Sequence, residues 1–275
     1  MNATEQAAFA GHALGRGVAE GLRGRARRAL VVLIAVRLGL VALLVLFAHP
    51  WLSPLGAPLL ARAAGERALH FPAAIEALPV AHGRWSGLLD LVLVPVIAAV
   101  TCVAVARRLP AEAAHTDPGR GILPGVLVML PIAFMSAHVE RALLAGVMGM
   151  ASGLVRAVVQ IAGACVLLSA LTAIGLPLLA LATLGHPRTG SAWDAWRWSW
   201  RRAGAAFVAL GVGATAANVI LTVAFLRASP VVAASAPELS AVGFAVETLT
   251  RSLLQWGLAG AAAVLWIGLV EDPWG

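Results

Sequence analysis

The chain reads AVVQIAGACVLLSALTAIGLPLLALATL from Ala157 to Leu184, without one charged residue. A helix needs about 20 predominantly apolar residues to cross the hydrocarbon core of a bilayer. Because a surface helix of a soluble protein carries a polar face, a run that is apolar on every side is typical of a helix surrounded by lipid or by other apolar helices. The run therefore predicts a membrane-spanning helix.

Similar apolar runs recur on both sides of it. The whole sequence is 60% hydrophobic and only 12% charged, whereas a soluble domain carries about 25% charged residues. The remaining predicted spans are 29–47, 87–106, 122–137, 203–226 and 252–270. The pattern predicts an all-α integral membrane protein with about six transmembrane helices in three hairpins, together with interfacial amphipathic helices.

Three segments do not fit a span. Residues 52–84 contain four prolines and several charges, so we expect an external loop with short helices on the membrane surface. Residues 142–155 are bounded by Arg141 and Arg156 and are too short to cross. We expect an interfacial or re-entrant helix there; the alternative is a seventh span that buries Arg156. Residues 227–250 are expected to form a second external segment.

Arginines gather on one side of this arrangement, in the N-terminal segment and in the joints after the second and fourth spans. They are Arg23, Arg25, Arg27, Arg28, Arg107, Arg108, Arg120, Arg188, Arg197, Arg201 and Arg202. Cytoplasmic loops are enriched in Lys and Arg, so both termini are predicted to be cytoplasmic. We expect a basic N-terminal segment at 1–28 that leads into a retained signal anchor, one polytopic domain at 29–270 and a tail at 271–275. The Ala-, Arg- and Gly-rich composition indicates a bacterial protein, and hence the inner membrane.

One charge falls inside a predicted span. Arg37 lies eight residues into the first span, about 12 Å at 1.5 Å per residue, where a charge is costly and marks an interior site or cavity. Asp90 on the next span is its candidate partner, although it lies near the external end of that span. With Asn218 these residues form a candidate intramembrane polar site for an anionic group. The alternative is that Arg37 snorkels to the headgroups.

A second group of charges is predicted at the external ends of spans. It consists of Glu140, Arg141, Arg156, Glu247 and Arg251. Glu247 and Arg251 have i,i+4 spacing, so they share a helix face and can pair. The group forms either interfacial ion pairs or an external polar mouth that leads in between the helices.

Four histidines fall on the same external side: His49, His70, His82 and His138. His49 and His138 end their spans at a similar level, an arrangement that can ligate haem, or zinc with a carboxylate such as Glu140. No two of them have ligand spacing within one helix, and interfacial histidines are the simpler interpretation. The two cysteines form no metal-binding pattern. We therefore expect no metal and no cofactor.

The most characteristic segment spans 191–202 and reads SAWDAWRWSWRR. Ser191 and Asp194 have the spacing of a helix capping box. Two faces follow at helical spacing: Trp193, Trp196 and Trp200 on one, Arg197 and Arg201 on the other. The segment predicts an amphipathic helix in the inner interface that leads into the next span. It is either a membrane anchor or a docking face for a cytoplasmic partner.

Residues 191–207, which follow the span that ends at Leu184, resemble a joint found in a loose group of bacterial six-helix membrane proteins. That group includes the membrane domain attached to some glycerophosphodiester phosphodiesterases and related stand-alone proteins. Its members share an aromatic, Ser- and Arg-containing amphipathic helix before a span that opens with small residues and Phe. The resemblance covers the second half of the chain. It implies a helical membrane domain without catalytic residues and, since no hydrolase sequence is attached, no phosphodiesterase activity.

The motifs of common enzyme classes are missing: the sequence has no P-loop, nucleophile elbow, HExxH zinc motif or Gly-rich dinucleotide motif. We therefore expect a non-catalytic accessory or scaffold subunit. One alternative is a permease or transporter subunit for an anionic or lipid-like solute, built on the Arg37 region. Another is a membrane-embedded lipid-modifying enzyme with Glu140 and His138 as acid and base. The net charge of +7 is assigned to anionic headgroups rather than nucleic acid, and the expected protein partner is another membrane protein or a second copy.

Overall fold

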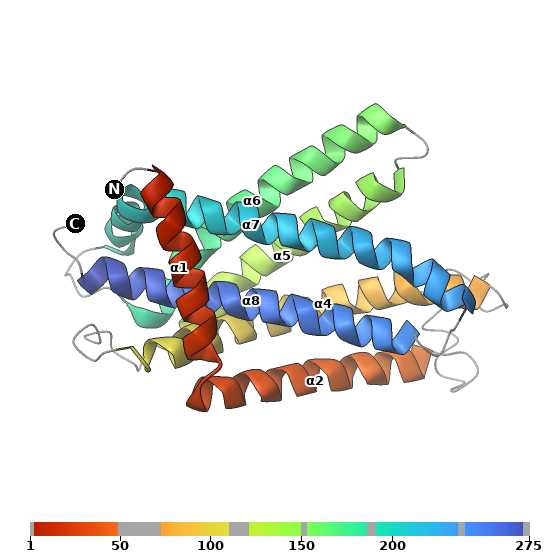
Figure 1. The fold of residues 1–275 in the computed structure, drawn as a ribbon, viewed down its shortest axis with the longest axis horizontal. Coiled ribbons are helices and arrows are strands. Elements are labelled where there is room, and N and C mark those ends of the chain that lie inside the picture. Colours follow the sequence, from red (N-terminus) through yellow and green to blue (C-terminus); the bar gives the residue numbers. More distant parts are fainter. Residues whose placement is uncertain are drawn as a thin grey trace. The chain divides into compact units, whose positions relative to one another are not determined.

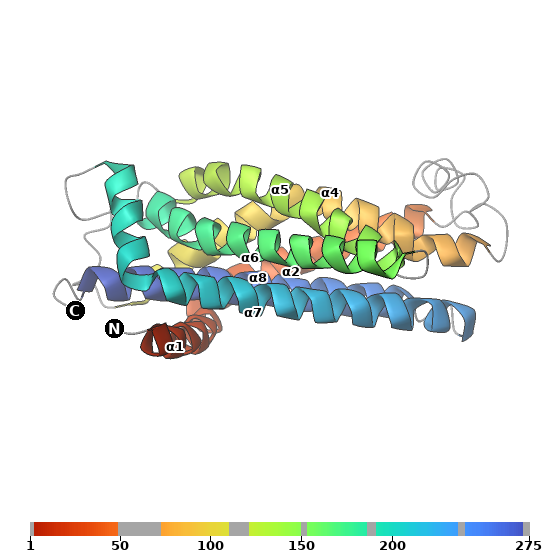
Figure 2. The same cartoon turned by 90° about the horizontal axis from the view of Figure 1, so that it is seen from above.

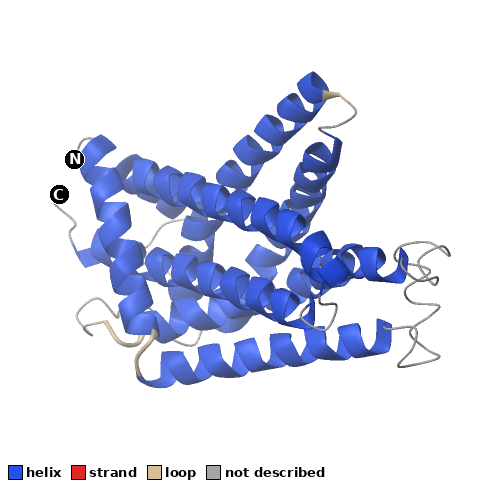
Figure 3. Cartoon of the chain, turned by 45° about the vertical axis from the view of Figure 1, so that its right-hand side comes forward, coloured by secondary structure: helices blue, strands red, loops and turns tan. Residues whose placement is uncertain are grey.

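The chain is helical wherever the computed structural model describes it (Figure 3). The described residues are 3–48, 73–109, 121–149, 153–185, 191–235 and 240–271. No strand occurs within these ranges, so the prediction of an all-α architecture is confirmed.

The helices follow one another along the chain as labelled in Figure 1. They are α1 (Ala3–Gly21), α2 (Gly24–Ala48), α4 (Ala73–Ala106), α5 (Ile122–Met148), α6 (Leu154–Leu184), α7 (Ala192–Ser235) and α8 (Ser240–Glu271). Five contain a segment long and apolar enough to cross a membrane: Gly87–Ala106, Ile122–Val147, Leu154–Leu184, Ala192–Phe225 and Val242–Val270. A helix satisfies its backbone hydrogen bonds internally, which is what a bilayer requires. The architecture is that of a multi-pass membrane protein.

The helices extend beyond the apolar runs that predict them. α5 continues through His138 to Met148, and α6 begins at Leu154. The predicted interfacial or re-entrant helix at 142–155 is therefore wrong, because its residues end one long helix and begin the next. Hydropathy marks the part of a helix that matches a membrane, whereas backbone hydrogen bonding continues into polar residues.

The same reason gives both predicted external segments more helix than the sequence predicts, and their external location stays a prediction. α7 continues to Ser235 and α8 begins at Ser240, so most of 227–250 is helical. Residues 73–84 are the first turns of α4 rather than separate surface helices. Residues 52–72, most of the joint at 107–120, residues 186–190 and residues 272–275 lie outside the described residues.

The chain divides into two compact units. Unit 1 comprises Met1–Val31, Leu91–Ala217 and Leu253–Gly275, and unit 2 comprises Val32–Asp90 and Asn218–Ser252. The division falls within α2, α4, α7 and α8. The prediction of one polytopic domain at 29–270 stays a prediction.

Small residues allow the helices of unit 1 to approach closely, as they do in membrane bundles. Gly17 of α1 faces Gly260 of α8, and a Cβ on Gly17 would lie 2.5 Å from the Gly260 carbonyl carbon. Ala10 and Ala13 of α1 are buried as well. Figure 1 shows α1 lying across α8 at this contact. The core of unit 1 also contains Trp266, whose indole Nε1 donates to the Gly185 carbonyl oxygen at 3.0 Å.

α7 consists of two helical parts that meet at a kink. Ala203 has φ −130° and ψ 19°, outside the helical region, and the Trp200 ring lies directly against Gly204, the next residue. Figure 2 shows the two parts at an angle to each other. At the start, the Ser191 Oγ accepts a hydrogen bond from the Asp194 backbone N–H at 3.2 Å. The helix predicted at 191–202, with Ser191 at its N-cap, is therefore confirmed.

α5 and α6 form an antiparallel pair within unit 1. The Gln160 Nε2 donates to the Ala142 carbonyl oxygen at 2.8 Å, and a Cβ on Gly146 would lie 3.0 Å from Ile161. In an 18-residue apolar stretch of the α5 segment only 6% of the residues are buried, against 67% in a stretch of the same length in the α8 segment. The apolar side chains of the α5 stretch are therefore mostly exposed, whereas those of the α8 stretch are mostly buried.

Candidate functional site

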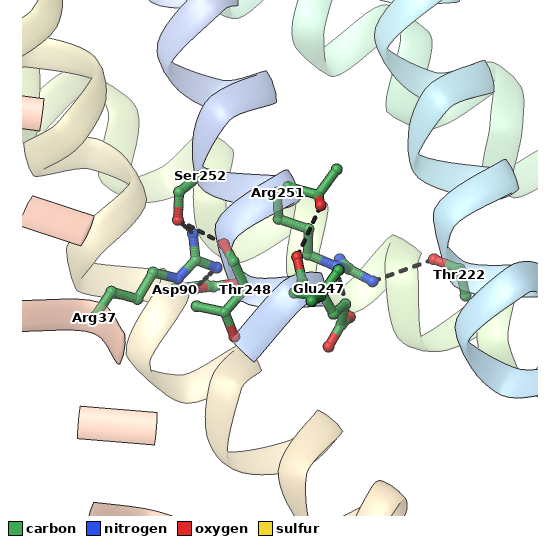
Figure 4. A network of polar contacts seen from close by, with 9 residues as sticks. Arg37, Asp90, Thr222, Glu247, Thr248, Arg251 and Ser252 are labelled. Carbon is green, nitrogen blue, oxygen red and sulfur yellow. Dashed lines mark hydrogen bonds and ion pairs between the residues drawn. The ribbon is translucent and has the colours of Figure 1, made fainter. Parts of the chain in front are cut away.

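Arg37 of α2 is the centre of a polar site in unit 2. Its side chain is 2% exposed, and its Nη2 lies 2.5 Å from the Asp90 Oδ1 of α4. Its Nη1 donates to the Ser252 Oγ of α8 at 2.8 Å (Figure 4). The structure therefore joins the predicted pair directly. The alternative of a snorkelling Arg37 is wrong, because the guanidinium is enclosed by partners from two other helices.

α4 is longer than the predicted span, and this places Asp90 well inside a helix. The sequence placed Asp90 near the external end of a span that begins at Gly87. However, α4 begins at Ala73, so Asp90 lies several turns into a continuous helix. Asp90 is partly buried, with 19% of its side chain exposed.

Ser252 connects Arg37 to the backbone of α8. The Ser252 Oγ donates to the Thr248 carbonyl oxygen at 2.7 Å while it accepts from Arg37. Both residues are buried. Because a hydroxyl both donates and accepts, the Ser252 Oγ satisfies the Arg37 guanidinium and the Thr248 carbonyl oxygen at once. Ser252 and Thr248 were not predicted from the sequence; their i,i+4 spacing beside Glu247 and Arg251 was the available signal.

A second ion pair lies on the adjacent face of α8. The Arg251 Nε lies 2.8 Å from the Glu247 Oε1, which confirms the predicted pairing. The Arg251 Nη2 also donates to the Thr222 Oγ1 of α7 at 3.2 Å (Figure 4). Both charged residues lie in the first ten residues of the Val242–Val270 segment.

Asn218, the third residue of the predicted intramembrane site, is in unit 2 on α7. It precedes Thr222 by one helical turn, so both residues occupy the same face of α7. Its side chain is partly buried.

The other residues of the predicted polar mouth belong to unit 1. Glu140 and Arg141 lie on α5 and Arg156 on α6. Arg141 and Arg156 are exposed, and Glu140 is half-buried. Glu247 and Arg251, in contrast, belong to unit 2, so a single mouth formed by all five residues stays a prediction.

His138 is exposed on α5, and its Nδ1 lies 2.8 Å from the Phe134 carbonyl oxygen. Its ring also lies 4.3 Å from the Phe134 ring, measured between centroids. His49 and His70 lie outside the described residues. Within the described ranges, no three His, Cys, Asp or Glu side chains come together in an arrangement that holds a metal ion.

The tryptophans of the first part of α7 form the predicted face. Trp193 stacks on Trp196 with ring centroids 4.8 Å apart, and Trp196 lies 5.8 Å from Trp200. Arg197 and Arg201 are exposed. This pattern is that of an amphipathic helix with an aromatic side and a basic side.

The described charges of the unit 2 site balance one another. Two guanidiniums, of Arg37 and Arg251, face two carboxylates, of Asp90 and Glu247. A buried charge that loses its partner is strongly destabilising, by about 3–5 kcal/mol. The contacts join α2 with α4 and α8, and α8 with α7. These contacts therefore connect four helices through polar side chains.

No known protein family, curated protein or solved structure matches the chain.

Proposed function

We propose that the chain is a non-catalytic multi-pass protein of a bacterial inner membrane that acts as an accessory or scaffold subunit. In this proposal it has about six spans, with α2 as the first, and both termini face the cytoplasm. The resemblance of residues 191–207 to the joint of bacterial six-helix membrane domains is consistent with this role and stays a hypothesis.

The exposed apolar surface of α5 carries the proposal. In an 18-residue apolar stretch of its segment Ile122–Val147 only 6% of the residues are buried, and Leu127 and Phe134 are 58% and 54% exposed. Exposed apolar side chains of this kind offer a surface to another membrane protein. The charges in unit 2 support the same role, because they are paired with one another and hold helices together.

Photo-crosslinking in intact membranes tests this role. A photoreactive residue at Leu127 is expected to give one discrete protein adduct, identified by mass spectrometry. The same residue at Leu179, which is 0% exposed, serves as the control and is expected to give none. Adducts with lipid alone from Leu127 would contradict the accessory role.

The orientation has its own test. A reporter that works only in the cytoplasm is expected to be active when it is fused to the C-terminus. Activity of a reporter that works only outside the cytoplasm would contradict the proposed topology.

A permease for an anionic or lipid-like solute is the second candidate. The observation that favours it is the presence of Arg37, Asp90, Glu247 and Arg251 within long apolar helices, since ionisable residues at such depth often mark solute pathways. Flux of small carboxylate and phosphate anions into proteoliposomes tests it. Arg37→Leu is expected to abolish such flux, and the exposed Arg227→Leu is the control.

A further inference from the structure

Exposed arginines meet where α1 turns into α2. We call this set the basic corner: Arg23, Arg27, Arg28, Arg107 and Arg108. The first three surround the turn, and the last two follow the end of α4. All belong to unit 1 and all are exposed.

The basic corner is fixed by specific contacts. Gly24 has φ +55°, a left-handed conformation that favours glycine, and the Arg108 Nη1 occupies the space that a Cβ there would need. The two carboxylate oxygens of Glu20 bridge Arg23 at 3.1 Å and Arg108 at 3.3 Å. Arg28 follows Gly24 by four residues in the first turns of α2.

The charges of the basic corner are not balanced by the described residues around it. Two of the five guanidiniums, those of Arg23 and Arg108, share the one carboxylate of Glu20, and the sum over these described side chains is 5 − 1 = +4. The guanidiniums of Arg27, Arg28 and Arg107 form no hydrogen bond or ion pair with a described residue, since Arg27 and Arg107 bond only through their backbone N–H groups. The first turn of α2 contains no acidic residue either, although the amide groups of a helix N-terminus favour an anion. The corner is therefore complementary to a negatively charged group.

The sequence after the corner indicates what kind of anion is available. Directly after Arg28 the chain reads ALVVLIAV, the start of the apolar part of α2. Guanidiniums placed where an apolar helix begins lie at the level of lipid headgroups. We propose that the basic corner binds the phosphate headgroup of an anionic phospholipid. This inference rests on the membrane placement in the proposed function and not on the existence of a protein partner.

Native mass spectrometry of the full chain in mild detergent tests the proposal. The chain is titrated with phosphatidylglycerol and with phosphatidylcholine of the same acyl chains. The wild type is expected to bind phosphatidylglycerol more tightly. The variant Arg27→Gln/Arg28→Gln/Arg107→Gln is expected to lose about tenfold or more in that affinity, since each basic residue near an anionic headgroup contributes appreciably.

The matched control is Arg141→Gln/Arg156→Gln/Arg227→Gln, which removes the same charge from exposed arginines elsewhere. It is expected to bind phosphatidylglycerol like the wild type. Equal losses in both variants, no loss in the corner variant, or no preference for phosphatidylglycerol in the wild type would overturn the proposal. Equally tight binding of inorganic phosphate would also overturn it, because the site would then be one for a free anion. The lipid titration does not depend on a protein partner. A failed titration therefore contradicts the lipid site, whereas a failed crosslinking experiment contradicts the accessory role.

Discussion

Gly17 of α1 and Gly260 of α8 face each other with their backbones in contact, so that a Cβ on Gly17 would lie 2.5 Å from the Gly260 carbonyl carbon. Such contact requires two residues without side chains. It places α1 in the core of unit 1 rather than in a loose N-terminal segment.

Replacement of Gly17 tests this contact. Gly17→Ala is expected to lower the stability of the chain by about 1–3 kcal/mol, the usual cost of overpacking. The control is Gly15→Ala on the same helix, where a Cβ would meet nothing within 4 Å. Because alanine favours a helix over glycine by roughly 0.5–1 kcal/mol, the control is expected to be neutral or stabilising. Thermal unfolding in detergent measures both, and equal behaviour of the two variants would argue against a tight α1–α8 crossing.

The Arg37–Asp90 pair should behave as a buried ion pair. Asp90→Leu is expected to cost on the order of 3 kcal/mol, because it leaves the Arg37 guanidinium with too few acceptors. The double variant Arg37→Met/Asp90→Leu should recover much of that loss, since no uncompensated charge remains. Denaturant unfolding in lipid nanodiscs compares them. If the double variant shows the simple sum of the two single losses, the two side chains are not coupled.

The N-cap of α7 predicts a local effect. Ser191→Ala is expected to destabilise the first turn by about 1 kcal/mol, because the Asp194 amide loses its side-chain acceptor. Amide hydrogen exchange at Asp194 and Ala195 should become faster, whereas Ser191→Thr should leave it nearly unchanged. Unchanged exchange in Ser191→Ala would mean that the cap does not hold the helix start.

Trp266 is expected to be more sensitive than the other tryptophans. Trp266→Phe leaves the Gly185 carbonyl oxygen without its indole donor in a buried position, which costs about 1–3 kcal/mol. Trp193→Phe is the control, since Trp193 is 60% exposed. Thermal unfolding should separate the two variants, and a larger loss for Trp193→Phe would contradict the assigned burial.

Hydropathy was sufficient to predict the helical class, and the predicted span 87–106 lies within the longer observed helix α4, Ala73–Ala106. Local chemistry predicted the Ser191–Asp194 cap. Helix length was not predictable in the same way, because α5 and α8 continue through charged residues that pair or lie at the surface.

Part of the polar site was predictable and part was not. Asp90 was identified as the partner of Arg37 because it is the acid on the next span. Ser252 and Thr222 were not identified, since serine and threonine are common in helices and only the three-dimensional arrangement shows which of them meets a guanidinium. The packing role of α1 was missed because its signal consists of alanines and glycines, which have weak individual preferences.

The hydrogen bond between Arg37 and Ser252 joins residues 215 positions apart, and this separation imposes an order on biogenesis. At a synthesis rate of about 5–20 residues per second, Ser252 leaves the ribosome roughly 11–43 seconds after Arg37. During that interval α2 has been synthesised, but Ser252, which accepts a hydrogen bond from Arg37, has not. α8 therefore completes the contacts of Arg37 last: a chain that stops before α8 can form the Arg37–Asp90 pair but lacks the Ser252 hydroxyl as a second acceptor.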